Sequence, residues 1–263
     1  MIATLCVLLG MPCPAVPVPP GIAQASDTIR VEVGSKEVNG KVYAPHAARV
    51  RVRIGSDTSR VVSEWTNELT VGDSAGRAVH RWVTKGTQYP PNSAPVTWEL
   101  RQTYDAVTLA PYGYLSERSN GARTQLVING TSVRGTRKLA GDTTVQQVDV
   151  TLDRGGFFAG ASDLVPLAVG FKEGRVMTAP VWSPTMTKAE MRIFSVIGKT
   201  PVNVEGTEVV AWKVEERRQS DRQLMATWYL LEKSPYMVYG EVPLPNGQTQ
   251  RMSEVEIPMS SKR

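Results

Sequence analysis

Cysteine and histidine are scarce in this chain, with two residues of each among 263. Cys6 and Cys13 lie near the N-terminus, in a segment that we expect to be removed on export. The mature chain would then have no disulfide, no thiolate metal site and no cysteine nucleophile. A catalytic triad or a two-histidine zinc site would need both His46 and His80. We expect His80 to lie on a strand surface rather than to act on a metal or a proton.

Charge is also limited. The chain has 30 Lys and Arg against 25 Asp and Glu, a net charge of +5, which makes it weakly basic and does not indicate a nucleic-acid partner. With 41% hydrophobic and 21% charged residues, the composition is that of a folded globular protein and excludes collagen, a disulfide-knotted miniprotein, a multispan membrane protein and general disorder. Arg49, Arg51 and Arg53 alternate on one predicted strand, as either a solvated face or a surface for anionic headgroups.

Long hydrophobic runs are rare. Residues 1–25 hold no charge, begin with an apolar run over 2–10 and end in Ala23-Gln24-Ala25, whose small residues suit a signal peptidase. We predict a signal peptide over 1–25, cleaved after Ala25, and export to the periplasm. A start codon slightly upstream would explain why no Lys or Arg follows Met1. The alternative is a membrane anchor, but the apolar run is too short for a hydrocarbon layer of about 30 Å.

The remaining chain has a dominant apolar period of two. For example, Val96, Trp98 and Leu100 alternate with polar residues, which places one face of a strand on a core and the other in water. We predict strands near 41–53, 60–71, 77–88, 96–104, 112–118, 122–128, 131–137, 143–152, 175–182, 189–198 and 209–218, with three more near 224–231, 236–243 and 249–257. Short connections predict antiparallel neighbours and therefore a mainly β meander.

Turn signals separate these strands. Asn129-Gly130 lies inside the clearest predicted hairpin, over 124–134, because Asn-Gly accepts positive φ at both central turn positions. The proline-rich stretch 89–95 either separates a small N-terminal part, 26–90, from 96–257 or is a loop within one sheet. We favour a single β-rich domain over 26–263.

One segment departs from this pattern. Residues 162–169 follow a glycine-rich loop and predict a short helix, which Ser162 or Asp163 can cap. Pro166 limits it to about two turns. A lone apolar helix in an all-strand chain usually lies across a sheet and covers it.

No catalytic constellation is evident. Gly198-Lys199-Thr200 lacks the earlier glycine of a phosphate loop, and Gly160–Leu164 lacks the last glycine of a nucleophile elbow. Asp149 and Asp153 are too far apart along one strand for paired carboxylate catalysis, and the 215–218 run of opposite charges is most simply a solvated strand edge. We therefore expect no enzyme, no cofactor and no metal.

Two longer segments resemble periplasmic half-barrel proteins. They are Val96–Tyr104 followed by Thr108–Pro111, and the run Ala226–Gly247 with its order of strand, proline loop, strand, Asn-Gly and strand. Outer-membrane lipoprotein carriers and lipoprotein-sorting-like proteins share this layout. The resemblance implies a curved antiparallel sheet, an incomplete barrel with a helix across its concave side, and non-covalent sequestration of a lipid, an acyl chain or an envelope partner. The chain departs from the carriers in having a single such helix.

Aromatic residues supply the candidate site. On a concave sheet, tryptophans and flexible methionines would line a groove for an apolar ligand, whereas the plainer alternative is that they fill the space under the helix. The candidate lining is Trp98, Phe157, Phe158, Leu164, Leu167, Trp182, Trp212, Trp228 and Tyr239. A structural or envelope-assembly protein that uses a sheet edge is the second hypothesis. An enzyme using His80 or a carboxylate pair is the third.

Overall fold

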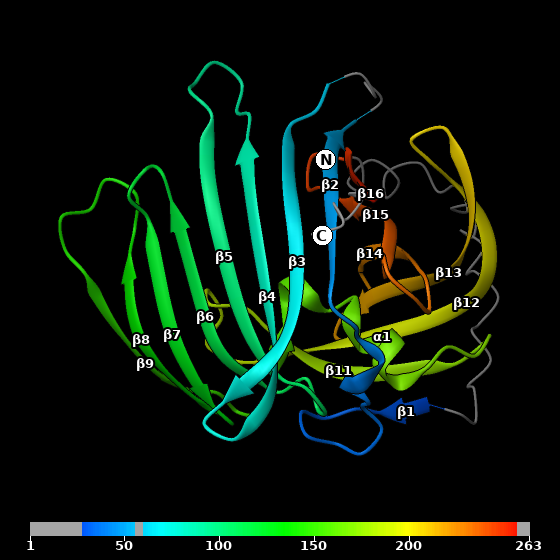
Figure 1. Cartoon of the computed structure of the whole chain (residues 1–263), viewed down its shortest axis with the longest axis horizontal. Coiled ribbons are helices and arrows are strands. Elements are labelled where there is room, and N and C mark those ends of the chain that lie inside the picture. The colour runs from blue at the N-terminus through cyan, green and yellow to red at the C-terminus, as the bar shows by residue number, and fades with distance from the viewer. Residues whose placement is uncertain (1–27, 56–59, 257–263) are drawn as a thin grey trace, which may run out of the picture.

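The computed structural model describes residues 28–55 and 60–256, so the predicted signal peptide lies outside the described residues. Most of the chain is strand, and the mainly β prediction is confirmed (Figure 1). The strands are β1 (Thr28–Arg30), β2 (His46–Ile54), β3 (Ser63–Ser74), β4 (Arg77–Gln88), β5 (Val96–Asp105), β6 (Pro111–Arg118), β7 (Arg123–Asn129), β8 (Ser132–Lys138), β9 (Gln146–Thr151), β10 (Phe157–Phe158), β11 (Val176–Trp182), β12 (Glu190–Val204), β13 (Thr207–Arg218), β14 (Leu224–Leu230), β15 (Met237–Pro243) and β16 (Thr249–Glu256).

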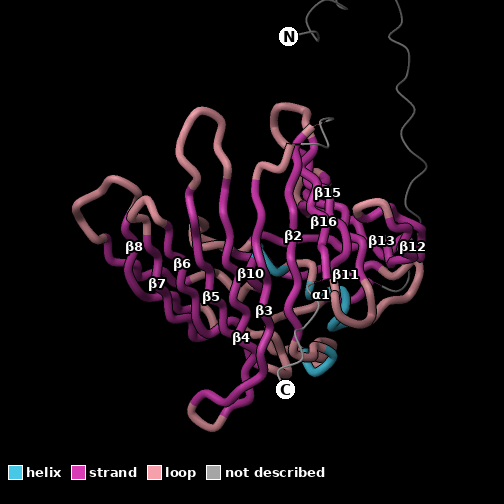
Figure 2. Tube along the Cα trace, turned by 45° about the horizontal axis from the view of Figure 1, so that its top comes forward, coloured by secondary structure: helices cyan, strands magenta, loops and turns pink. Residues whose placement is uncertain are grey.

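These strands form one sheet that curves without closing into a barrel (Figure 2). Two meanders, β2 to β9 and β11 to β16, join where β16 pairs with β2. β1 and β10 run parallel to β11, and the other pairs of the described sheet are antiparallel. The sheet path therefore ends on β9 on one side and on β1 on the other.

All fourteen predicted strands are present. β1 and β10 were not predicted, because three and two residues are too short to show a period. The predicted 124–134 hairpin is also present, with its turn one residue later than expected. Asn129 pairs with Ser132, so Gly130 (φ 60°) and Thr131 occupy the central turn positions. The loop 89–95 joins β4 to β5, which pair with each other.

Because side chains alternate along a strand, one face of the sheet lies toward the inside of the curve. In β2, Ala48, Val50 and Val52 are buried, whereas the arginines between them face outward. Outside, Arg49 and Arg51 both pair with the Glu64 carboxylate, with N–O distances of 2.7 and 2.9 Å. The predicted arginine stripe is therefore a ladder of ion pairs on the outer face.

The inner face is covered by residues from the middle of the chain. The η2 turn (Ala159–Ala161) leads into α1 (Leu164–Val169), and Leu164 to Ala168 are all buried. The predicted helix is confirmed, but neither Ser162 nor Asp163 caps it through its side chain. The Tyr43 hydroxyl donates to the Leu164 carbonyl oxygen, which ties the η1 turn (Gly40–Val42) region to the cover.

The expected surface position of His80 is wrong. The even residues of β4 point inward, so His80 is buried, and its Nε2 lies 2.9 Å from the Gly40 carbonyl oxygen. Tyr43 packs edge-on against His80 and also against Tyr236, which in turn packs against His46. The two imidazoles are therefore separated by aromatic rings.

We expect Phe158→Ala to destabilise the fold strongly. The Phe158 side chain is 1% exposed, and its ring contacts those of Tyr104, Tyr114 and Trp182. Removing it leaves a cavity, which costs about 3–5 kcal/mol of the free energy of unfolding. Chemical denaturation checks this, with Val127→Ala at a 65% exposed position as the control. Equal losses of the free energy of unfolding in the two variants would contradict the assignment of Phe158 to the core.

Candidate functional site

A pocket of about 160 Å³ lies between the inner face of the sheet and the cover formed by η2 and α1. β3, β4 and β5 supply one wall, and β14, β15 and β16 supply the opposite wall. The lining residues are Trp65, Asn67, Trp82, Thr84, Trp98, Leu100, Gln102, Gly160, Ala161, Asp163, Leu164, Trp228, Met237 and Met252. Four indoles and two thioethers therefore surround a space close in size to an engineered cavity of about 150 Å³ that binds benzene.

Two of the indoles are placed by a glycine. Trp65, Gly86 and Trp98 are direct neighbours across β3, β4 and β5, and the two ring centroids are 5.9 Å apart. A Cβ atom on Gly86 would lie 2.7 Å from the Trp65 Cβ and 2.8 Å from the Trp98 ring. The rings can therefore meet over β4 because the residue between them has no side chain.

The opposite wall is held by a buried carboxylate. The Trp228 indole N–H and the Ser162 hydroxyl both donate to Glu216 Oε2, each at 2.9 Å. Arg192 Nη1 lies 3.4 Å from Glu216 Oε1. Burial raises the pKa of Glu216, while the Trp228 hydrogen bond and the Arg192 charge act in the opposite direction. This carboxylate fixes the plane of the Trp228 ring.

The prediction that 215–218 forms a solvated edge is wrong for Glu216. Its side chain is 3% exposed, because it shares the inner face with Val214. Glu215 faces outward and pairs with Arg217 at 2.8 Å, which agrees with the predicted solvated edge.

Asp163 brings a second carboxyl group to the pocket, at the start of α1. Burial and the nearby charge of Glu216 raise the pKa of Asp163 to about 7. Glu254 on β16 is buried nearby, and burial and the charge of Asp163 raise its pKa well above the usual value. Within 28–55 and 60–256, no group of three His, Cys, Asp or Glu residues is arranged to hold a metal ion.

The nearest imidazole adds no positive charge. His46 packs edge-on against the pocket residue Trp82, with ring centroids 5.5 Å apart. Burial lowers the pKa of His46, so its ring is neutral at neutral pH.

The structure distributes the predicted lining residues over three places. Trp98, Leu164 and Trp228 line the pocket. Phe157, Phe158, Leu167 and Trp182 lie in the hydrophobic core. Trp212 stacks on Phe171 and donates its N–H to Glu232, and Tyr239 packs with Val204, Ala211 and Val238 in a separate small cluster.

The predicted list omitted Trp65, Trp82, Met237, Met252 and Asp163, which the structure places around the pocket. Strand alternation assigns Trp65 and Trp98 to apolar faces, so the first omission was recoverable from the sequence. The position of Asp163 was not, because it depends on how α1 meets the sheet.

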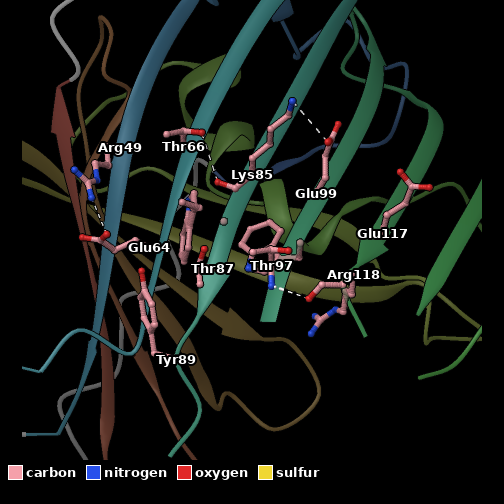
Figure 3. Close-up of a pocket in the computed structure, with 14 residues that line it drawn as sticks. Arg49, Glu64, Thr66, Lys85, Thr87, Tyr89, Thr97, Glu99, Glu117 and Arg118 are labelled. Carbon is pink, nitrogen blue, oxygen red and sulfur yellow. Dashed lines mark hydrogen bonds and ion pairs between the residues drawn. The ribbon is translucent and has the colours of Figure 1, made fainter. Parts of the chain in front are cut away.

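A second hollow, of about 820 Å³, lies along β2 to β6 and shares Trp65 and Trp98 with the inner pocket (Figure 3). Four of its charged side chains form two ion pairs with each other. Arg49 pairs with Glu64 at 2.7 Å, and Lys85 pairs with Glu99 at 3.6 Å. Because these four charges already have partners and the inner pocket is lined by four indoles, we take the inner pocket as the candidate site.

The fold is that of an open, β-barrel-like sheet with a pocket on its inner face. The chain belongs to the family described as Protein of unknown function (DUF3108), whose model matches residues 28–253. It is also similar to the crystal structure of a beta-barrel-like protein of domain of unknown function DUF1849 from Brucella abortus. That match has a TM-score of 0.51 and 11% identity and covers 83% of this chain and 98% of the other, which shows the fold alone.

None of the curated proteins compared with the chain matches it. Among the described residues, no helix has the length and apolar character needed to cross a membrane.

We expect Gly86→Ala to disturb the indole pair. The added methyl group would also lie 2.7 Å from the Glu64 carbonyl oxygen, so backbone and rings must shift, at a cost of roughly 1–3 kcal/mol. Denaturation and tryptophan fluorescence measure both effects. Gly113→Ala is the matched control, because there the new Cβ would meet Thr103 at an ordinary 3.7 Å. Similar behaviour of the two variants would refute the close approach.

We expect Asp163 to make stability depend on pH. Its pKa is raised on folding to about 7, so its contribution to the free energy of unfolding is present in acid and is lost as the pH rises from about 4 to about 7. Asp163→Asn should reduce that decline, because the amide does not ionise. Denaturation midpoints across this range measure the slope, and an unchanged slope in the variant would show that the carboxyl is not desolvated.

Proposed function

We propose that this chain is an exported, non-enzymatic binding protein that holds an apolar ligand in the inner pocket. The observation that carries the proposal is the lining itself, in which four indoles and two methionine side chains converge on about 160 Å³. Burying apolar ligand surface there releases about 25 cal/mol for each Å² removed from water. Methionine adapts to varied ligand shapes, which suits a lipid or an acyl chain.

The ligand can reach this pocket. Trp65, Trp82, Trp98 and Trp228 are all partly exposed, in contrast to the fully buried core rings of Phe158 and Trp182. A chain longer than the pocket would extend past these indoles toward solvent. The pocket is therefore suited to one end of an elongated ligand.

The resemblance to outer-membrane lipoprotein carriers supports a lipid or acyl ligand, because those proteins hold acyl chains in a half-barrel under a helical cover. The predicted cleavage after Ala25 supports a periplasmic location, where such ligands pass between membranes. Both points refine the binding role and rest on the sequence rather than on the pocket geometry.

We expect Trp98→Ala to weaken binding of decanol, a neutral apolar probe, by about tenfold, because the indole supplies one wall of the pocket. Quenching of tryptophan fluorescence or calorimetry would report the affinity. The matched control is Trp212→Ala, which removes an inner-face indole outside the pocket.

Native mass spectrometry of protein purified from cells would add a second readout, a co-purified apolar mass. Absence of both probe binding and a bound mass would refute the proposal, and so would equal losses for the two tryptophan variants.

One observation favours a second candidate function, envelope assembly through a sheet edge. β9 ends the sheet path and, within the described strands, pairs with β8 alone. Such an edge accepts an added strand from a partner. Concentration-dependent association in sedimentation that Val148→Pro abolishes would support this alternative.

A further inference from the structure

The pocket holds a carboxyl group that has no cationic partner. Asp163 lines the pocket, and among the described residues no side chain donates a hydrogen bond to its carboxylate and no cation pairs with it. The same is true of Glu254, which is 6% exposed. Unpaired carboxyl groups are unusual in an interior, because desolvation of the charged form is expensive.

The surroundings are rich in carboxyl groups. Three carboxyl groups lie near the start of α1, those of Asp163, Glu216 and Glu254. Arg192 is the cation within reach of Glu216, and it also pairs with Glu190 at 2.5 Å. His46, beside the pocket, is neutral. A positive charge entering the pocket would favour the ionised form of these carboxyl groups, and the low local dielectric would strengthen the attraction.

The indoles suit the same charge. The face of a tryptophan ring attracts ammonium groups more strongly than that of tyrosine or phenylalanine, and several such rings around one site form a cage for quaternary ammonium ligands. Trp65, Trp82, Trp98 and Trp228 all line this pocket together with Asp163. A purely apolar ligand would not require a carboxylate in its site, and a small hydrated cation would not require four indoles.

We propose that the ligand of this pocket carries a positively charged amine or quaternary ammonium group, which sits against Asp163 among the four indoles while its apolar part fills the remaining space. This inference rests on the proposed function and narrows it to cationic amphiphiles. Gln102, Asn67 and Thr84, which also line the pocket, offer oxygen acceptors to an N–H group on such a ligand.

The test compares three probes with the same alkyl chain and different heads: decyltrimethylammonium, decanol and decanoate. Calorimetry with the chain as purified would measure each affinity. We expect decyltrimethylammonium to bind about 10-fold more tightly than decanol and decanoate to bind most weakly. In Asp163→Asn this preference for the cation should disappear while decanol binding is kept, which also shows that the variant is folded.

The matched control is Asp149→Asn, which removes an exposed carboxylate on β9 paired with Arg134 at 3.3 Å. It should keep the preference for the cation. Equal binding of decanol and decyltrimethylammonium, or tightest binding of decanoate, would overturn the cationic ligand and leave the binding function standing. A preference that survives in Asp163→Asn would overturn the role of Asp163. If none of the three probes binds, the proposed function fails as well.

Discussion

A sheet that curves without closing has an apolar inner face that it cannot bury against itself. The rest of this structure depends on how that face is covered. The cover comes from the chain between β9 and β11, where Phe157 and Phe158 join the edge of β11 and α1 follows directly. Because this segment enters as an extra strand on the sheet, its position relative to the inner face is fixed by backbone hydrogen bonds as well as by packing. The hydroxyl of Tyr43 holds α1 from the other side.

The pocket is the part of the inner face that the cover leaves unfilled. Where Phe158 and Trp182 pack together, the interior is continuous, whereas the indoles over Gly86 leave a space between sheet and helix. Two unpaired carboxyl groups in this region oppose folding, because water would solvate them better than the protein does. Carboxyl groups whose pKa is strongly raised tend to occur at functional sites, and Asp163 lies at the pocket.

Sequence patterns predicted the strands well because each inner-facing apolar residue alternates with an outer polar one. They were less informative where a polar residue points inward. His80 and Glu216 both read as surface residues, yet both are buried on the inner face, as Thr84 is on β4 and Val214 is on β13. The pairing of β13 with β14 also shifts register between Glu216 and Arg217, and the local sequence pattern does not predict this shift. The sequence predicted that aromatic residues would line a pocket. Which of them do so depends on which strands lie opposite each other across the curved sheet.

The sequence by itself determined the strand positions, the antiparallel order of neighbours and the short buried helix, because these follow from local periodicity, turn chemistry and chain length between elements. The tertiary structure alone decided that β16 would pair with β2, that Trp65 and Trp98 would meet over Gly86, and that Asp163, at the start of α1, would line one pocket with Trp228 and lie near Glu254. Those contacts join residues far apart in the chain, and their geometry is set by the curvature of the whole sheet. Curvature accumulates from the twist of every strand pair, so no single segment encodes it.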